Sequence, residues 1–104
     1  MTFDLFIDSI QSKQQLRGLP APLKALWLDG VGDWESAHEA IQEESDIGSA
    51  LVHAYLHRKE GDLWNARHWY KTAGRKPFEG PLKTEWEVLV REFLSLGSPA
   101  LEAR

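Results

Sequence analysis

Two segments of this chain share one pattern of small, turn-forming and large residues, and this repetition limits the possible folds more than any other feature. The segments are ALWLDGVGDWESAHEAI, from Ala25, and AYLHRKEGDLWNARHWY, from Ala54, and an offset of 29 residues aligns them. In each, a Gly-Asp pair can end one helix and cap the next, and alanines on either side allow two helices to approach closely. The sequence therefore predicts two copies of a helix–turn–helix hairpin.

Helix signals also dominate outside the repeat, so we expect an all-α fold of five or six helices in a single domain, residues 1–104. No segment shows the sustained alternation of apolar and polar residues that is typical of a strand. We expect repeat-like hairpins at about 21–45 and 49–77, with capping helices at about 3–17 and 82–97. Gly97 and Pro99 predict the end of the last helix, and we expect the final residues to fray.

The second copy carries small residues, one aromatic residue and a proline at defined positions: Ala54, Gly61, Ala66, Tyr70, Ala73 and Pro77. This pattern resembles that of tetratricopeptide and Sel1-like repeats, and the likeness covers roughly residues 21–77. The resemblance implies antiparallel helical hairpins and a role in protein interaction. The motifs GDW..AH and LHR.EGD..NA..WY..AG also resemble a family of small uncharacterised bacterial proteins, a likeness that implies no particular activity.

The composition excludes several classes of protein and site. The chain has no cysteine, which rules out disulfides and thiolate metal sites. The N-terminal stretch lacks the basic segment of a signal peptide, and no stretch approaches the ~20 apolar residues of a membrane span. We therefore expect a cytoplasmic protein with no membrane partner, and no motif indicates a cofactor.

Charge is unevenly distributed along the chain. Seven acidic and no basic residues lie from Asp29 to Asp46, whereas six basic and two acidic residues lie from Ser49 to Phe78. Adjacent segments of opposite sign are expected to attract each other within the fold, or to form solvated faces. The alternative is a basic surface for an anionic partner. Nucleic acid is an unlikely partner because the net charge of the whole chain is −4.

The second hairpin also concentrates polar and aromatic side chains that the repeat does not require. The candidate binding surface consists of His53, His57, Trp64, Asn65, His68 and Trp69. His53 and His57 share one helical face, which continues to Glu60. Residues equally far from the turn face each other in an antiparallel hairpin, so we expect His57 near Asn65 and His53 near Trp69 or His68. His38 lies in the first hairpin and can approach only if the hairpins stack.

Three interpretations of this cluster are open. His53 and His57 are weak candidates for metal ligands, with Glu60 or His68 as a further ligand. Alternatively, one of the two histidines acts as an acid or base while Asn65 orients a substrate. The structural interpretation is that His57 and Asn65 bond across the turn and that His53 stacks on Trp69.

The tryptophans and tyrosines separate into two groups by their expected position. Residues on the apolar helical stripes are expected in the core: Trp27, Trp34, Tyr55, Tyr70 and Trp86. Trp64 and Trp69 lie on different faces of one helix, so one of them is expected at the surface or at an interface.

The leading hypothesis for function is a protein-interaction or self-associating module. The alternative is a small metal-dependent or acid–base enzyme that uses His53, His57 and Asn65.

Overall fold

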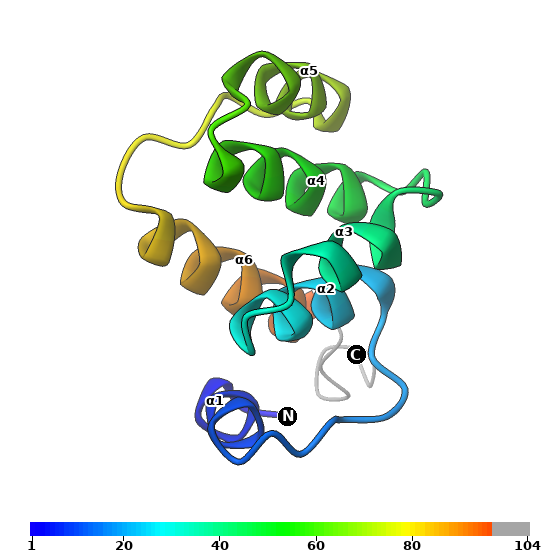
Figure 1. Cartoon of the computed structure of the whole chain (residues 1–104), viewed down its shortest axis with the longest axis vertical. Helices are drawn as coiled ribbons and strands as arrows, with labels where there is room; N and C mark the ends of the chain where they lie inside the picture. Colours follow the sequence, from blue (N-terminus) through cyan, green and yellow to red (C-terminus); the bar gives the residue numbers. More distant parts are fainter. Residues whose placement is uncertain (97–104) are drawn as a thin grey trace.

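The computed structural model describes residues 1–96, and this part of the chain is all-helical, with six helices and no strand (Figure 1). The helices are α1 Phe3–Gln11, α2 Ala21–Gly30, α3 Trp34–Ile41, α4 Ile47–Glu60, α5 Leu63–Ala73 and α6 Leu82–Leu96. The expected all-α fold of five or six helices is thus confirmed. The predicted stop at Gly97 and Pro99 and the fraying of the final residues lie outside the described residues.

The two Gly-Asp turns have nearly the same conformation. Gly32 and Gly61 have φ angles of +92° and +90°, a left-handed backbone that glycine adopts without steric cost. Asp33 and Asp62 then cap the next helices, and each carboxylate accepts a hydrogen bond from the backbone N–H three residues later, at 3.0 Å and 3.2 Å. The pairs α2–α3 and α4–α5 therefore follow from the same local chemistry.

Two helices end earlier than the sequence predicts. α1 ends at Gln11 rather than near residue 17: the Ser12 hydroxyl donates to the Asp8 carbonyl at 2.9 Å, and Lys13 has a left-handed φ of +55°. α3 ends at Ile41 rather than near residue 45, because Ile41 is its last buried side chain and the residues that follow are exposed. Without an apolar face to bury, a further helical turn gains little stability in water.

α4 lies at the centre of the molecule, and all eight of its residues from Ser49 to Leu56 are buried. It pairs with α5 and also contacts α2, α3 and α6, while α2 pairs with α3 and α1 packs on α2 and α6 (Figure 1). Because α4 of the second hairpin touches both helices of the first, the two hairpins are stacked.

The last helix does not extend this stack beyond α5. After the connector that follows α5, α6 returns to pack against α2 and α4 (Figure 1). Its Glu85 is 2% exposed and accepts hydrogen bonds from the Tyr70 hydroxyl and, at 2.9 Å, from Arg58. Burial raises the pKa of Glu85, against the opposing effects of Tyr70 and Arg58. α6 therefore covers α2 and α4.

Half of the basic residues between 49 and 78 form ion pairs within the fold. The pairs are Arg58–Glu85 at 2.9 Å, Lys59–Asp29 at 2.8 Å and Arg75–Glu92 at 2.6 Å. Only Lys59–Asp29 joins the basic segment to the acidic one, while the other two pairs hold α6. The expected attraction between the two segments is therefore limited to one buried carboxylate.

The aromatic residues of the helical stripes pack in or against the core, as predicted. Trp27, Tyr55 and Tyr70 are buried, and Trp34 and Trp86 are half-buried against the core cluster. Each of the three indole N–H groups has an acceptor at 2.9–3.0 Å: Trp27 donates to Ser9 Oγ, Trp34 to the Leu56 carbonyl and Trp86 to the Leu26 carbonyl. These bonds satisfy polar groups whose burial would otherwise be costly.

Candidate functional site

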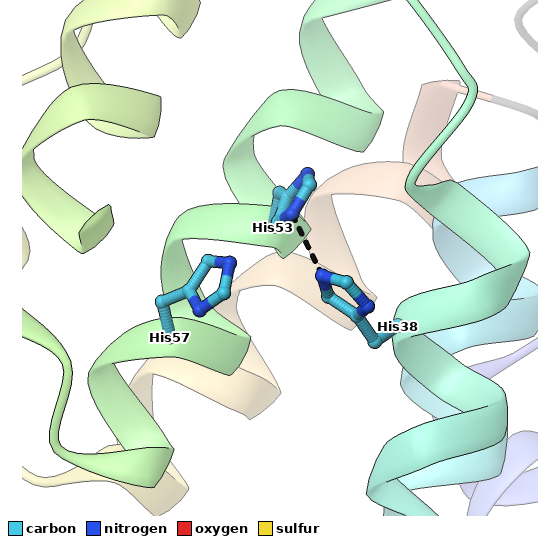
Figure 2. Close-up of side chains that lie close together, drawn as sticks. All are labelled: His38, His53 and His57. Atoms are coloured by element: carbon cyan, nitrogen blue, oxygen red, sulfur yellow. Dashed lines mark hydrogen bonds between the residues drawn. The ribbon is translucent and has the colours of Figure 1, made fainter.

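Three histidine rings meet where the two hairpins stack. His38 comes from α3, and His53 and His57 come from consecutive turns of α4 (Figure 2). The Nε2 atoms of His38 and His53 lie 3.0 Å apart. The ring of His57 lies 4.9 Å from that of His53 and 5.3 Å from that of His38, measured between centroids. One ring nitrogen from each histidine belongs to a set whose members all lie within 4.8 Å of one another.

A carboxylate fixes the orientation of the third ring. Nδ1 of His57 lies 2.6 Å from Oε2 of Glu60, one helical turn away on α4. In a neutral His57 ring beside an ionised carboxylate, Nδ1 carries the proton and donates it to Glu60, so that Nε2 keeps a free lone pair. Figure 2 shows one nitrogen of His57 directed toward the space beside His38 and His53. The Glu60 carboxylate thus selects the tautomer that presents a lone pair to the other two rings.

Two tryptophans hold the other rings in place. Trp69, from α5, stacks on His53 with centroids 4.0 Å apart and an interplanar angle of 12°. Trp34, at the start of α3, stacks on His38 at 5.1 Å and 5°. Because the Trp34 indole also donates to the Leu56 carbonyl at 2.9 Å, it ties α3 to α4 beside the histidines. The rings therefore sit in a packed aromatic frame and keep little rotational freedom.

The surroundings favour neutral imidazoles. Burial lowers the pKa of His53 from its ordinary value of 6.5 to about 4, and the neighbouring His38, His57 and His68 lower it further. Burial also lowers the pKa of His38, again with help from His57. His53 is 5% exposed. At neutral pH both rings are uncharged, and the contact between their Nε2 atoms is an N–H···N hydrogen bond in which one ring donates.

Such a group of neutral imidazoles has the chemistry of a transition-metal site. Imidazole nitrogen suits zinc, copper, iron and nickel ions. Two nitrogen ligands 2.0–2.1 Å from a tetrahedral zinc ion lie roughly 3.3 Å from each other. The separation of 3.0 Å between the Nε2 atoms of His38 and His53 is close to that value. A small opening of the pair, with the proton of the donor ring moved from Nε2 to Nδ1 of the same ring, would place both Nε2 lone pairs on one ion.

The structure brings together only part of the predicted surface. His53, His57 and Trp69 meet, and His53 stacks on Trp69 as the structural interpretation predicts. Asn65 does not reach His57: its side-chain amide donates to the Asp62 carboxylate at 2.6 Å, because the capping aspartate lies closer along the chain. Glu60 is the residue that binds His57 instead.

The remaining two members of the predicted surface lie outside the cluster. His68 is exposed, and its ring meets Trp69 edge to face at 5.2 Å. Trp64 is 72% exposed, which identifies it as the surface tryptophan of α5. His68 therefore contributes no ring nitrogen to the set that His38, His53 and His57 form.

Sequence reasoning left His38 outside the cluster, although a signal for it was present. His38 lies three residues before the end of α3, and His53 lies six residues after the start of α4, so both are near the connector between these helices. The rule that residues equally far from a turn face each other applies there only approximately, whereas at Gly61 it places His53 opposite Trp69. The contact of His38 with His53 could not be predicted from the sequence, because it requires α3 to pack on α4 across this connector.

Comparisons with known proteins add no second source of evidence. No family model, no curated protein and no solved structure matches the chain. Among the described residues, no helix combines the length and the apolar character that crossing a bilayer requires.

Proposed function

We propose that this chain is a helical-hairpin protein that binds one divalent transition-metal ion, of the zinc class, through His38, His53 and His57. The observation that carries the proposal is the convergence of three ring nitrogens within 4.8 Å of one another. The ligands come from both hairpins, so a bound ion would join α3 to α4. Three protein ligands leave the fourth position of a tetrahedral ion for water or a small anion.

The Glu60–His57 contact is an independent argument for this function. Histidines that bind metals commonly donate their other ring N–H to a carboxylate, which fixes the ring and makes the ligand nitrogen more basic. Glu60 lies 2.6 Å from Nδ1 of His57 in that arrangement. Loss of such an outer partner typically weakens metal binding 10–100-fold. We therefore expect Glu60→Gln to weaken zinc binding while leaving the three ligands in place.

The test is a titration of metal-free protein with Zn²⁺ by calorimetry, and with Co²⁺ followed by its visible absorption as a report of tetrahedral nitrogen ligands. The wild-type chain should bind one ion. His38→Gln should weaken binding at least about tenfold, because it removes one of the three ligands and leaves only the pair on α4. His68→Gln is the matched control, since His68 is exposed on α5.

Circular dichroism of each variant separates loss of ligand from loss of fold. If His38→Gln binds zinc as tightly as the wild type, the site is at most an ordinary i,i+4 chelate on one helix and the proposal is wrong. The same holds if the wild type binds no zinc or cobalt at micromolar concentrations.

A metal-dependent or acid–base enzyme at this site stays a prediction, and it rests on the open fourth position. Its measurement is zinc-dependent hydrolysis of an activated ester. Activity that disappears in His38→Gln and persists in His68→Gln would support it, because a zinc-bound water becomes a nucleophile at neutral pH. Activity that is equal in the two variants would exclude this site as its source.

Self-association is the second candidate function, and one specific observation favours it. Leu63 and Trp64, adjacent at the start of α5, are 55% and 72% exposed. α5 is the end of the stack that α6 leaves uncovered. We propose a second copy of the chain as the occupant of this end, because packing of α5 against α5 of the second copy would continue the stack of helices.

The test is sedimentation at several protein concentrations, which should show concentration-dependent dimers. Trp64→Gln should remove these dimers, and Val88→Gln, at an exposed site on α6, should retain them. A monomer at all concentrations would contradict this proposal.

A further inference from the structure

A second feature, independent of the histidines, is a cavity of about 450 Å³ between α1, α2, α4 and α6. Much of its wall is apolar, formed by Ile7, Ile10, Leu82 and Trp86. This volume falls within the range of small-molecule sites, which combine apolar walls with a few convergent polar groups. The sequence gives no indication of the cavity, because its walls come from four separate helices.

The base of the cavity is closely packed. An added Cβ on Gly30 would lie 2.7 Å from Cδ1 of Ile10 and 3.1 Å from Cζ2 of Trp86, so the end of the Ile10 side chain would have to shift to admit it. The Trp86 indole donates to the Leu26 carbonyl at 3.0 Å, and its ring contacts that of Phe6 at 6.2 Å. Trp86 is therefore a fixed wall and not a mobile side chain.

The polar side of the cavity contains one carboxylate and two lysines. Asp29 is 4% exposed, and its two oxygens accept from the Tyr55 hydroxyl at 2.7 Å and from Lys59 at 2.8 Å. Lys83 is exposed at the rim and forms no ion pair with any residue in the range 1–96. Since Asp29 is already paired, the charge left without a partner is a positive one.

The position of Lys83 in α6 also favours a negatively charged ligand. It is the second residue of α6, and the free backbone N–H groups at the start of a helix favour a negative charge nearby. Lys59, which also lines the cavity, keeps about 40% of its side-chain surface exposed while it pairs with Asp29. The rim therefore offers two cations above an apolar wall.

We propose that this cavity binds a small amphipathic carboxylate, with its apolar body against Trp86 and Ile10 and its carboxylate near Lys83 and Lys59. A cation would be repelled by the unpaired lysine. A neutral molecule of the same shape would gain the apolar contacts alone. A single carboxylate fits because one positive charge remains uncompensated at the rim. A dianion would carry one negative charge more than this rim can neutralise.

The experiment compares three probes with the same apolar body, octanoate, octanol and octylamine, by heteronuclear NMR titration in the presence of a chelator. Octanoate should bind most tightly and shift signals of Gly30, Leu82 and the Trp86 indole N–H. Octanol should bind more weakly at the same place, and octylamine more weakly still. Equal binding of octanoate and octanol, or shifts confined to other parts of the molecule, would overturn the proposal.

Two variants and one control complete the test. Lys83→Gln should weaken octanoate binding about fivefold without changing octanol binding, as expected for the loss of one solvent-exposed charge pair. Leu82→Trp, at a half-buried wall position, should block both ligands. Lys71→Gln, on the exposed face of α5, should change neither. If Lys83→Gln and Lys71→Gln behave alike toward octanoate, the assignment of the carboxylate to this rim is wrong.

Discussion

The buried imidazole of His53 makes a quantitative prediction about acid stability in the metal-free protein. The pKa of His53 falls from 6.5 in the unfolded chain to about 4 in the folded one, chiefly through burial. As the pH drops below 6.5, the unfolded state takes up a proton that the folded state does not, so the free energy of unfolding falls. The loss continues until the pH reaches about 4, where the folded state is protonated as well.

The size of this effect follows from the same two values. Each pKa unit is worth about 1.4 kcal/mol, so the interval from 6.5 to about 4 corresponds to about 3 kcal/mol. That is a large share of the stability of a domain of this size, which is typically 5–15 kcal/mol. His38 faces His53 at 3.0 Å, and Trp69 covers it at 4.0 Å between centroids, so water cannot easily relieve the burial.

The assay is urea unfolding at a series of pH values from 7 to 4, with a chelator present, for the wild type and for His53→Asn. Asparagine cannot take up a proton, so the difference in unfolding free energy between the two proteins should shrink by about 3 kcal/mol as the pH falls. Lys71→Gln, on the exposed face of α5, is the control, because it removes no imidazole from the cluster. A constant difference between wild type and His53→Asn across this range would refute the reasoning.

Further expected outcomes concern the metal, the buried ion pair and one turn. Zinc at a hundredfold excess over its dissociation constant should stabilise the wild type by about 2.7 kcal/mol, or roughly 10–20 °C in Tm by calorimetry, and an unchanged Tm would contradict the metal site. Arg58→Met leaves Glu85 buried at 2% exposure without its cation and should cost about 3 kcal/mol or more in urea unfolding. Glu87→Gln, which removes an exposed pair, should cost less than about 1 kcal/mol, and equal costs would argue against burial as the cause. Gly61→Ala should cost about 1–2 kcal/mol: an added Cβ meets no atom within 4 Å, and only the φ of +90° opposes it. A stability unchanged within error would exclude that strain.

Local chemistry explains why the helical hairpins are predictable from sequence. Gly61 and Asp62 act within a few residues of themselves: the glycine adopts its left-handed φ, and the aspartate caps α5. The ends of α1 and α3 are less predictable, because burial decides whether one more turn is stable. The path of α6 is not predictable at all from local signals. It depends on Glu85 reaching Arg58 and Tyr70, two contacts between distant parts of the chain.

The candidate site shows the same division between near and distant contacts. His53, His57 and Glu60 share a face of α4 by helical periodicity, and Trp69 faces His53 across the Gly61 turn. The expected bond from His57 to Asn65 does not form, since Asp62 competes for the amide from three residues away.

The sequence by itself determined the all-α class, the two Gly-Asp turns and the pairing of His53 with His57, because each depends on interactions between residues close in the chain. Only the tertiary structure decided that His38 completes a three-imidazole cluster and that Trp64 faces outward. It also decided that α6 forms one wall of a cavity lined by Asp29. These three outcomes depend on how whole helices pack, and packing is settled by the summed burial of many side chains rather than by any one motif.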